Sequence, residues 1–173
     1  MSWNWDQLLT ATFTLFAIID IIGSIPLLIA LKEKMGGIRE IQATLISGGL
    51  MILFLLIGES FLKVLGLDKK SFAVGGSIVI FILGLEMVLG HEFFKSEKNP
   101  RAGTVVPIAF PLIAGSGTLT TIMSLKALYD DQYVLIAILL NLGIVYIVLK
   151  SLNFLQKLDR KSTRLNSSHI TIS

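Results

Sequence analysis

Long apolar segments alternate with short polar connectors along the chain. Five apolar segments stand out, at residues 8–31, 41–65, 72–89, 105–125 and 134–149. About 20 helical residues cross the ~30 Å hydrocarbon core of a bilayer, so each segment has roughly the length of one crossing. Lipid offers no hydrogen bonds to an open backbone, so such segments must be helical. The pattern therefore predicts an all-α, polytopic transmembrane helical bundle.

Composition agrees with this class. Of the 173 residues, 53% are hydrophobic and 16% are charged, whereas a soluble domain carries about a quarter charged residues. The chain has no cysteine, which excludes disulfides, thiolate metal sites and a thiol nucleophile. We expect membrane lipid to surround the bundle, and homo-oligomers are compatible with the sequence.

The connectors carry an uneven distribution of positive charge. Eight Lys and Arg residues lie in the first connector, the third connector and after the fifth segment, against four on the opposite side. Loops rich in Lys and Arg stay in the cytoplasm. We therefore expect a multi-pass membrane protein with its first and third connectors in the cytoplasm and its N-terminus outside.

The last fifteen residues, DRKSTRLNSSHITIS, differ from everything before them. They are polar, and all of them can be encoded in frame by a common sequencing adapter with its index. We interpret 159–173 as an artefactual, disordered tail and 1–158 as one integral membrane domain. Without the tail, three basic residues and one acidic residue are lost and the net charge falls from +3 to +1. No basic surface for nucleic acid then remains.

Two segments carry helix breakers at corresponding places. The first contains GSIP at 23–26 and the fourth contains GSGT at 115–118, which is 92 residues further on. Adding the same offset to position 41, where the second segment starts, gives position 133, next to the start of the fifth segment. Adding it to position 72, where the third segment starts, gives a position inside the tail. The chain is thus expected to be a 3+3 inverted repeat with halves at 8–91 and 104–158, broken helices 1 and 4, and five of six helices present.

Each break has a chemical consequence. The half-helix that follows a break begins with unpaired N–H groups and the positive end of the helix dipole, which attract an anion such as a carboxylate. Ser24 and Ser116 are predicted N-caps, and Pro26 fits an early helical position that needs no N–H. Matched Gly and Pro residues also serve helix packing, as Gly48-Gly49 and Gly75-Gly76 are expected to do.

Several polar residues fall inside the apolar segments, where they usually face a cavity or a partner. Asp20 lies three residues before the first break, and its carboxylate can bind Na⁺, a proton or a substrate ammonium; a structural Asp is the alternative. Glu59 and Glu86 are candidates for ion or proton coupling or for contact with the interface. Asn141 can bind substrate or join two helices. For His91 we expect an interfacial position.

Other chemistries lack the residues that they require. No His and carboxylates have metal-ligand spacing, no Gly-rich loop precedes a Lys as in a P-loop, and GSGT lies in a membrane segment without a histidine base. We therefore expect no enzymatic activity, no catalytic residue, no metal and no cofactor, with Na⁺ or H⁺ as the conceivable coupling ion.

Three stretches resemble a known family. DIIGSIP, SFAVGGSIVIFILGLEMV and VPIAFPLIAGSGTLTTIM resemble the first, third and fourth helices of the MarC family of inner-membrane proteins. Ile21 replaces the usual Pro, Ser24 the usual Asn, and Ser116 stands where the family commonly has Pro. The resemblance covers 8–158 and implies a six-helix protein of a bacterial or archaeal inner membrane. It also implies a relation to LysE-type exporters, in a family catalogued as small neutral amino acid transporters.

The sequence thus predicts a secondary transporter of small neutral amino acids or similar small metabolites, with its substrate at the midplane. The candidate substrate-binding residues are Asp20, Gly23, Ser24, Pro26, Pro111, Gly115, Ser116, Gly117, Thr118 and Asn141. Two alternatives stay open: a scaffold or regulatory membrane protein without transport activity, and a drug or metabolite exporter of the same fold.

Overall fold

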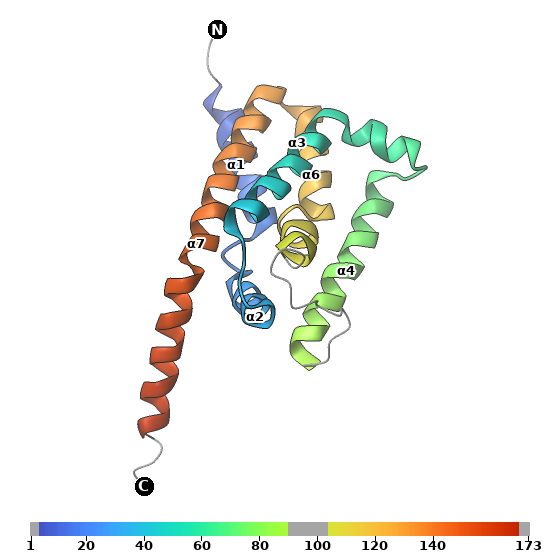
Figure 1. Cartoon of the computed structure of the whole chain (residues 1–173). Coiled ribbons are helices and arrows are strands. Elements are labelled where there is room, and N and C mark those ends of the chain that lie inside the picture. The colour runs from blue at the N-terminus through green and yellow to red at the C-terminus, as the bar shows by residue number, and fades with distance from the viewer. Residues whose placement is uncertain (1–3, 90–103, 170–173) are drawn as a thin grey trace.

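The computed structural model describes residues 4–89 and 104–169, and helices account for nearly all of them (Figure 1). No strand occurs in these two ranges. The elements in chain order are α1 (Trp5–Ile19), α2 (Ile25–Met35), α3 (Glu40–Val64), α4 (Lys69–Leu89), the irregular helical segment η1 (Thr104–Ile113), α6 (Ser116–Leu128) and α7 (Asp131–His169). The all-α prediction is confirmed for the described residues.

Of the five expected membrane spans, the described residues contain two or three that meet the length and composition of a span. Among the described residues, α3 and the Asp131–Leu152 part of α7 are long and apolar enough to cross a bilayer, and η1 with α6 forms a third span if this pair, bent by 42°, is counted as one. The first predicted span is divided into α1, with 15 residues, and α2, with 11. Neither reaches the length of about 20 residues that a bilayer core requires.

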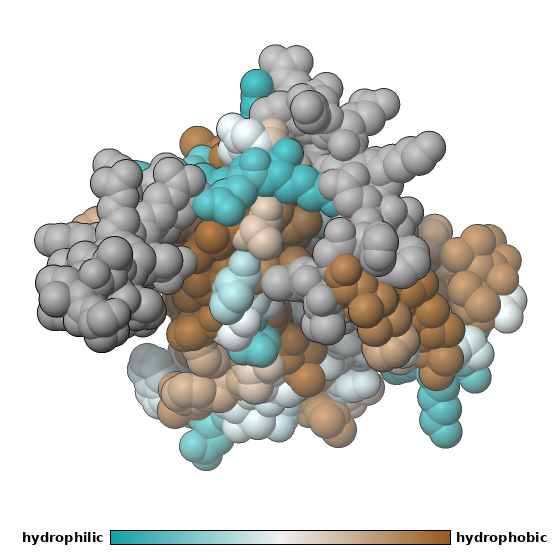
Figure 2. All heavy atoms as spheres, turned by 90° about the horizontal axis from the view of Figure 1, so that it is seen from below, coloured by the Kyte–Doolittle hydropathy of each residue, from teal (hydrophilic) through white to brown (hydrophobic). Residues whose placement is uncertain are grey.

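Apolar side chains face both inward and outward. Ala11, Leu15, Leu28, Met51 and Ile138 are fully buried in one core cluster. Large apolar side chains such as Phe13, Leu45 and Ile147 are exposed, and apolar surface is visible at the centre and on the right in the view from below (Figure 2). Apolar residues on both faces are typical of helices that contact lipid on one side and other helices on the other.

Small residues let the helices approach closely. A Cβ at Gly48 of α3 would lie 2.7 Å from the Leu142 Cδ1 atom of α7, and a Cβ at Gly76 of α4 would collide with the Ser116 side chain of α6. Nothing lies within 4 Å of such an atom at Gly49 or Gly75. One glycine of each predicted pair therefore serves packing, as small residues do in membrane bundles.

Packing joins elements that are distant in sequence. Helix α7 packs against α1, α2 and α3, while α3 also packs against η1 and α6 (Figure 1). Helix α4 packs against α6 and η1. The core is therefore built by elements from both halves of the chain, with α3 and α7 in contact at its centre.

Two hydrogen bonds tie the N-terminal end to the α6–α7 connector and to the first turn of α7. The Asn4 N–H donates to the Tyr133 hydroxyl at 3.0 Å, and the Asp130 N–H donates to Gln7 Oε1 at 3.5 Å. The chain start and this connector therefore lie at the same end of the bundle, as the alternation of spans predicts.

The C-terminal end of the described chain is helical, and the interpretation of 159–173 as an artefactual tail stays a prediction. Helix α7 continues without interruption to His169, and its last turns extend beyond the other helices in Figure 1. No Gly or Pro occurs between residues 144 and 169, so the sequence contains neither of the residues that commonly end a helix.

Candidate functional site

The first break separates α1 from α2 and is organised by Asp20. This residue ends α1 in the left-handed conformation, with φ 43° and ψ 47°, and its N–H donates to the Phe16 carbonyl at 3.1 Å. Asp adopts this conformation more readily than most residues. Its Oδ1 atom accepts the Gly23 N–H at 3.1 Å. A Cβ at Gly23 would collide with the Asp20 carboxylate, so a side chain at position 23 would have to displace that carboxylate from its hydrogen bond.

Helix α2 starts where the breakers predicted. Ser24 occupies the N-cap position and Pro26 lies in the first turn, where its missing N–H costs nothing. The Ser24 side chain makes no capping hydrogen bond. The Ser24 N–H donates instead to the Asp20 carbonyl at 3.0 Å, and the Ile25 N–H donates to the Ile22 carbonyl at 3.1 Å. The turn itself therefore uses most of the amides that were expected to be free.

The second break separates η1 from α6 and depends on two prolines. Val106 and Phe110, which precede Pro107 and Pro111, have extended backbones, with φ −128° and ψ 120° and with φ −137° and ψ 130°. A proline ring disfavours the helical conformation of the residue before it. The Ala114 N–H consequently donates to the Ala109 carbonyl at 2.9 Å, one residue beyond the usual α-helical partner.

The start of α6 differs from its prediction. Gly115, extended with φ −74° and ψ 171°, is the N-cap, and Ser116 is the first helical residue. The Ser116 hydroxyl donates to the Ala73 carbonyl of α4 at 3.4 Å, and the Thr118 hydroxyl donates to the Ile113 carbonyl at 3.0 Å. The prediction of Ser116 as an N-cap was wrong, because the extended backbone ends at Gly115 and Ser116 already belongs to the helix.

The amides at the start of α6 remain available. The regular hydrogen-bond series begins with the Leu119 N–H, which donates to the Gly115 carbonyl at 2.9 Å. Within the described ranges, the N–H groups of Ser116, Gly117 and Thr118 have no acceptor. Ser116 and Thr118 are buried, whereas Gly117 is exposed. Helix α6 therefore presents the better anion-binding end of the two half-helices.

The two breaks lie next to each other. A Cβ at Gly117 would lie 3.7 Å from Ile18 Cγ2, and Ile18 is in the last turn of α1, two residues before Asp20. Asp20 is exposed. The arrangement thus places a carboxylate and a set of helix-terminal amides on adjacent elements, which suits a ligand with one positive and one negative group.

Asn141 of α7 joins two helices. Its side-chain amide donates to the Thr12 carbonyl of α1 at 3.1 Å and to the Ala137 carbonyl of its own helix at 2.9 Å. The residue is only 2% exposed. Both N–H donors of this amide are thus used by the main chain, as the structural alternative for Asn141 predicts.

The other candidate polar residues lie elsewhere or outside the described part. Glu59 forms an ion pair at 2.5 Å with Lys69, at the start of α4. Glu86 belongs to α4, but its side chain lies outside the described residues, and so does His91. Among residues 4–89 and 104–169, no group of three His, Cys, Asp or Glu side chains is arranged to hold a metal ion.

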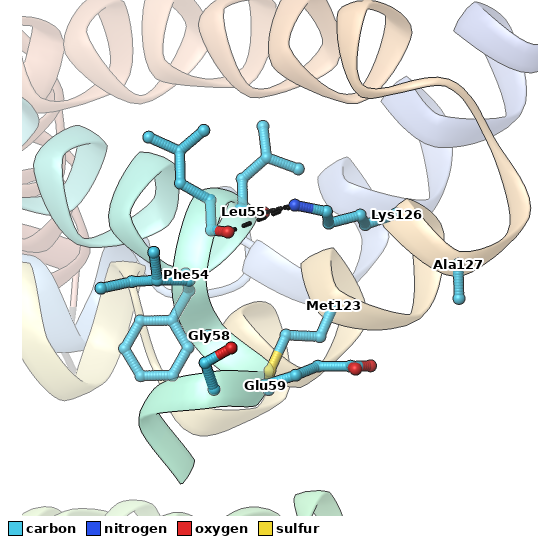
Figure 3. Close-up of a pocket in the computed structure, with 10 residues that line it drawn as sticks. Phe54, Leu55, Gly58, Glu59, Met123, Lys126 and Ala127 are labelled. Carbon is cyan, nitrogen blue, oxygen red and sulfur yellow. Dashed lines mark hydrogen bonds between the residues drawn. The ribbon is translucent and has the colours of Figure 1, made fainter. Parts of the chain in front are cut away.

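Sequence reasoning missed a cavity of about 320 Å³ between α3 and α6 (Figure 3). Residues 54–60 of α3 and Met123, Lys126 and Ala127 of α6 line it. In the sequence, Lys126 was counted only as one of the four positive residues on the side opposite the cytoplasm. Nothing in the side-chain spacing marked this cavity, because Lys126 binds the main-chain carbonyls of Leu55 and Leu56.

These features define an integral membrane protein built of helices, two of which are interrupted at adjacent points. The family model described as MarC family integral membrane protein matches residues 5–166. The chain therefore belongs to the MarC family. The match includes the first eight residues of the segment 159–173.

Individual relatives are distant but similar over most of the chain. The UPF0056 membrane protein MJ1677 of Methanocaldococcus jannaschii is 29% identical over 168 residues, which are 88% of this chain and 82% of that protein. The UPF0056 inner membrane protein YhgN of Escherichia coli is 28% identical over 90% of this chain and 84% of its own length. A UPF0056 membrane protein of Buchnera aphidicola is 29% identical over 72% of this chain and 66% of its own length. No solved structure matches the chain.

Proposed function

We propose that this chain is an inner-membrane secondary transporter of small neutral amino acids or similar small metabolites, with its substrate bound where the two helices are interrupted. The observation that carries the proposal is the contact of the breaks, in which Gly117 of α6 faces Ile18 of α1. Interrupted helices at corresponding positions of two halves mark the substrate sites of many secondary transporters.

The spacing of the helix starts supports a repeat. Helix α6 starts 91 residues after α2 (116 minus 25), and α7 starts 91 residues after α3 (131 minus 40). This constant difference is within one residue of the offset in the sequence. The segments before and after each break thus follow the same order in both halves.

The packing supports the same repeat. Under this correspondence, α1 is equivalent to η1, α2 to α6 and α3 to α7. The contact of α1 with α7 then corresponds to the contact of η1 with α3. In the same way, the contact of α2 with α7 corresponds to the contact of α6 with α3. Two inverted halves of three helices each would produce these reciprocal contacts. An equivalent of α4 would complete the second half and pack against α1 and α2.

The proposed ligand geometry follows from the two break surfaces. The substrate carboxylate would bind the N–H groups at the start of α6, and its ammonium, or a coupling Na⁺ or H⁺, would bind Asp20. The relative YhgN is named an inner membrane protein, which supports that location. Placing the N-terminus outside follows from the distribution of positive charge.

Uptake of radiolabelled alanine, serine and glycine into proteoliposomes that contain the 173-residue chain tests the proposal. Asp20→Asn keeps an oxygen that can accept the Gly23 N–H and removes only the charge, so uptake should fall about tenfold or more while the protein stays folded. Gly117→Leu should fill the space between the breaks and abolish uptake. Its matched control, Gly117→Ala, adds a Cβ in ordinary contact with Ile18 and should leave most of the uptake.

Two results would contradict the proposal. Saturable uptake that is unchanged in both Asp20→Asn and Gly117→Leu would remove the broken helices from the site. No saturable flux of any amino acid by the wild-type chain, with no ligand-dependent thermal shift, would favour the scaffold alternative. Flux of larger or apolar compounds in place of amino acids would favour the exporter.

A further inference from the structure

The cavity between α3 and α6 lies on a different part of the bundle from the residues of the two breaks. Its volume of about 320 Å³ is at the lower end of the range of about 300–1,000 Å³ found for ligand pockets, so it suits a small molecule. Phe54, Leu55 and Met123 contribute apolar surface, while Glu59 and Lys126 contribute opposite charges. In Figure 3 these side chains surround the space from two helices.

Lys126 is held in place by two main-chain carbonyls and one long ion pair. Its Nζ atom donates to the Leu55 carbonyl at 2.7 Å and to the Leu56 carbonyl at 3.3 Å, both in α3. The nearest described carboxylate oxygen, Asp131 Oδ2, is 3.6 Å away. Neutral carbonyls and a long ion pair leave this ammonium group able to gain from a carboxylate at hydrogen-bonding distance.

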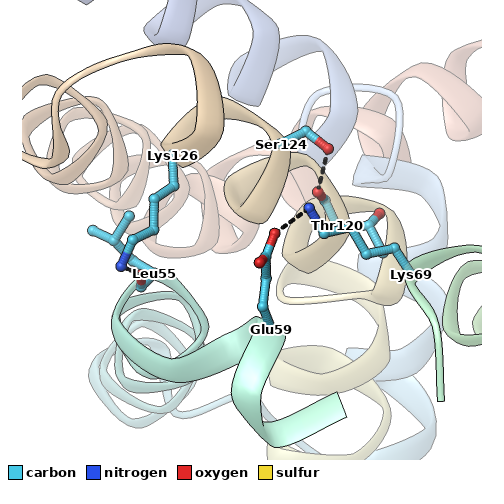
Figure 4. Close-up of polar contacts among 6 residues, drawn as sticks. All are labelled: Leu55, Glu59, Lys69, Thr120, Ser124 and Lys126. Atoms are coloured by element: carbon cyan, nitrogen blue, oxygen red, sulfur yellow. Dashed lines mark hydrogen bonds and ion pairs between the residues drawn. The ribbon is translucent and has the colours of Figure 1, made fainter. Parts of the chain in front are cut away.

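Glu59 supplies the complementary charge from the opposite helix. Its side chain is 49% exposed and pairs with Lys69 of α4 (Figure 4). Glu59 lies five residues before the end of α3 at Val64, and Lys126 lies two residues before the end of α6 at Leu128. With about 1.5 Å of rise per residue, both charges are near the helix ends. The cavity is therefore placed near the aqueous interface, on the side of the chain's N-terminus.

We propose that this cavity is a second binding site, for a small zwitterion whose carboxylate contacts Lys126 and whose ammonium contacts Glu59. The apolar lining accommodates an aliphatic side chain. Binding here goes beyond the transport proposed above, because it requires only the described contacts between α3 and α6 and no passage through the broken helices. It shares with that proposal only the chemical class of the ligand.

Protection of a single introduced thiol tests this site directly. The chain has no cysteine, so Ala127→Cys provides one reactive group in the cavity wall. Its rate of modification by a maleimide is measured in the presence of one of three compounds. L-alanine carries both charges, propionate carries the negative charge alone, and propylamine carries the positive charge alone. L-alanine should protect most, propionate less, and propylamine least. Lys150→Cys, on an exposed position of α7, is the control that no probe should protect.

Variants in the Ala127→Cys background assign the charges. Lys126→Met should weaken protection by L-alanine about tenfold or more, because a charged hydrogen bond is lost. Glu59→Gln should reduce L-alanine to the level of propionate. Lys126 also joins α6 to α3, so its loss could disturb the fold. Asp131→Asn avoids that difficulty: it removes the competing carboxylate and should strengthen protection by propionate several-fold, whereas a purely structural Lys126 predicts no gain.

The outcomes separate the two sites. Protection that persists in Asp20→Asn and disappears in Lys126→Met supports the cavity, even if the chain transports nothing. Equal protection by propylamine and propionate, unchanged protection in Lys126→Met, or no gain in Asp131→Asn would each overturn the proposal. Protection lost in Asp20→Asn alone would assign the ligand to the broken helices.

Discussion

Gly117 at the start of α6 faces Ile18 in the last turn of α1. A Cβ atom at Gly117 would lie 3.7 Å from the Ile18 Cγ2 atom. These residues are 99 positions apart, and each adjoins an interruption in its helix. Their proximity places the free N–H groups at the start of α6 beside the C-terminal end of α1, which Asp20 caps. The predictions below test the contacts that hold this arrangement.

The turn at Asp20 should tolerate Asn and Gly but not Val. The residue has φ 43°, which Asn and Gly adopt easily and a β-branched residue does not. Asp20→Val should therefore lower the free energy of unfolding by about 1–2 kcal/mol, whereas Asp20→Asn should remain close to wild type. Chemical denaturation in detergent micelles measures the difference. Equal stability of the Val and Asn variants would contradict the left-handed turn.

Gly76 should be intolerant of any side chain. A Cβ there would collide with Ser116, so Gly76→Ala should destabilise the contact between α4 and α6 by about 1–3 kcal/mol. The matched control is Gly75→Ala, which has nothing within 4 Å and should be neutral or slightly stabilising. Thermal unfolding of both variants provides the comparison. Adding Ser116→Gly to Gly76→Ala should restore part of the loss, and failure to do so would point to another cause.

Asn141→Leu should weaken the protein without changing its substrate affinity. The substitution removes the bonds to the Thr12 and Ala137 carbonyls. Such bonds contribute about 0.6–2 kcal/mol in membrane proteins. Thermal unfolding should show this loss, while the KM of residual uptake stays constant. A raised KM at unchanged stability would instead place Asn141 in the substrate site.

Asp68 should make the start of α4 sensitive to acid. Its Oδ1 atom accepts the Ser71 N–H at 2.6 Å, and this hydrogen bond holds the pKa of Asp68 below its usual range. Its contribution to stability is therefore complete above the unfolded-state pKa of about 3.9 and is lost as the pH falls through the lower folded-state value. Asn at this position can cap without titrating. Thermal unfolding between pH 6 and pH 3 should show a steeper decline for wild type than for Asp68→Asn, and parallel declines would contradict this role.

Local chemistry made much of the fold predictable. The GSIP sequence at 23–26 located the first break and the GSGT sequence at 115–118 located the second, because Gly and Pro interrupt helices. The capping residue of α6 was missed by one position, because the choice between Gly115 and Ser116 depends on packing against Ala73 and Gly76 of α4. Lys126 and its cavity were missed for a related reason. Their partners, Leu55 and Leu56, are main-chain carbonyls, which leave no trace in the side-chain pattern.

The exchange of partners between the two halves constrains how the protein can move. Helix α7 lies against α1 and α2, and η1 and α6 lie against α3, so each half is embedded in the other. Two lobes that rock as rigid bodies would have to tear these interfaces apart. For the proposed transport, opening toward alternate faces of the membrane would therefore come from the short half-helices α2 and α6 turning at their breaks, while α3 and α7 stay in contact.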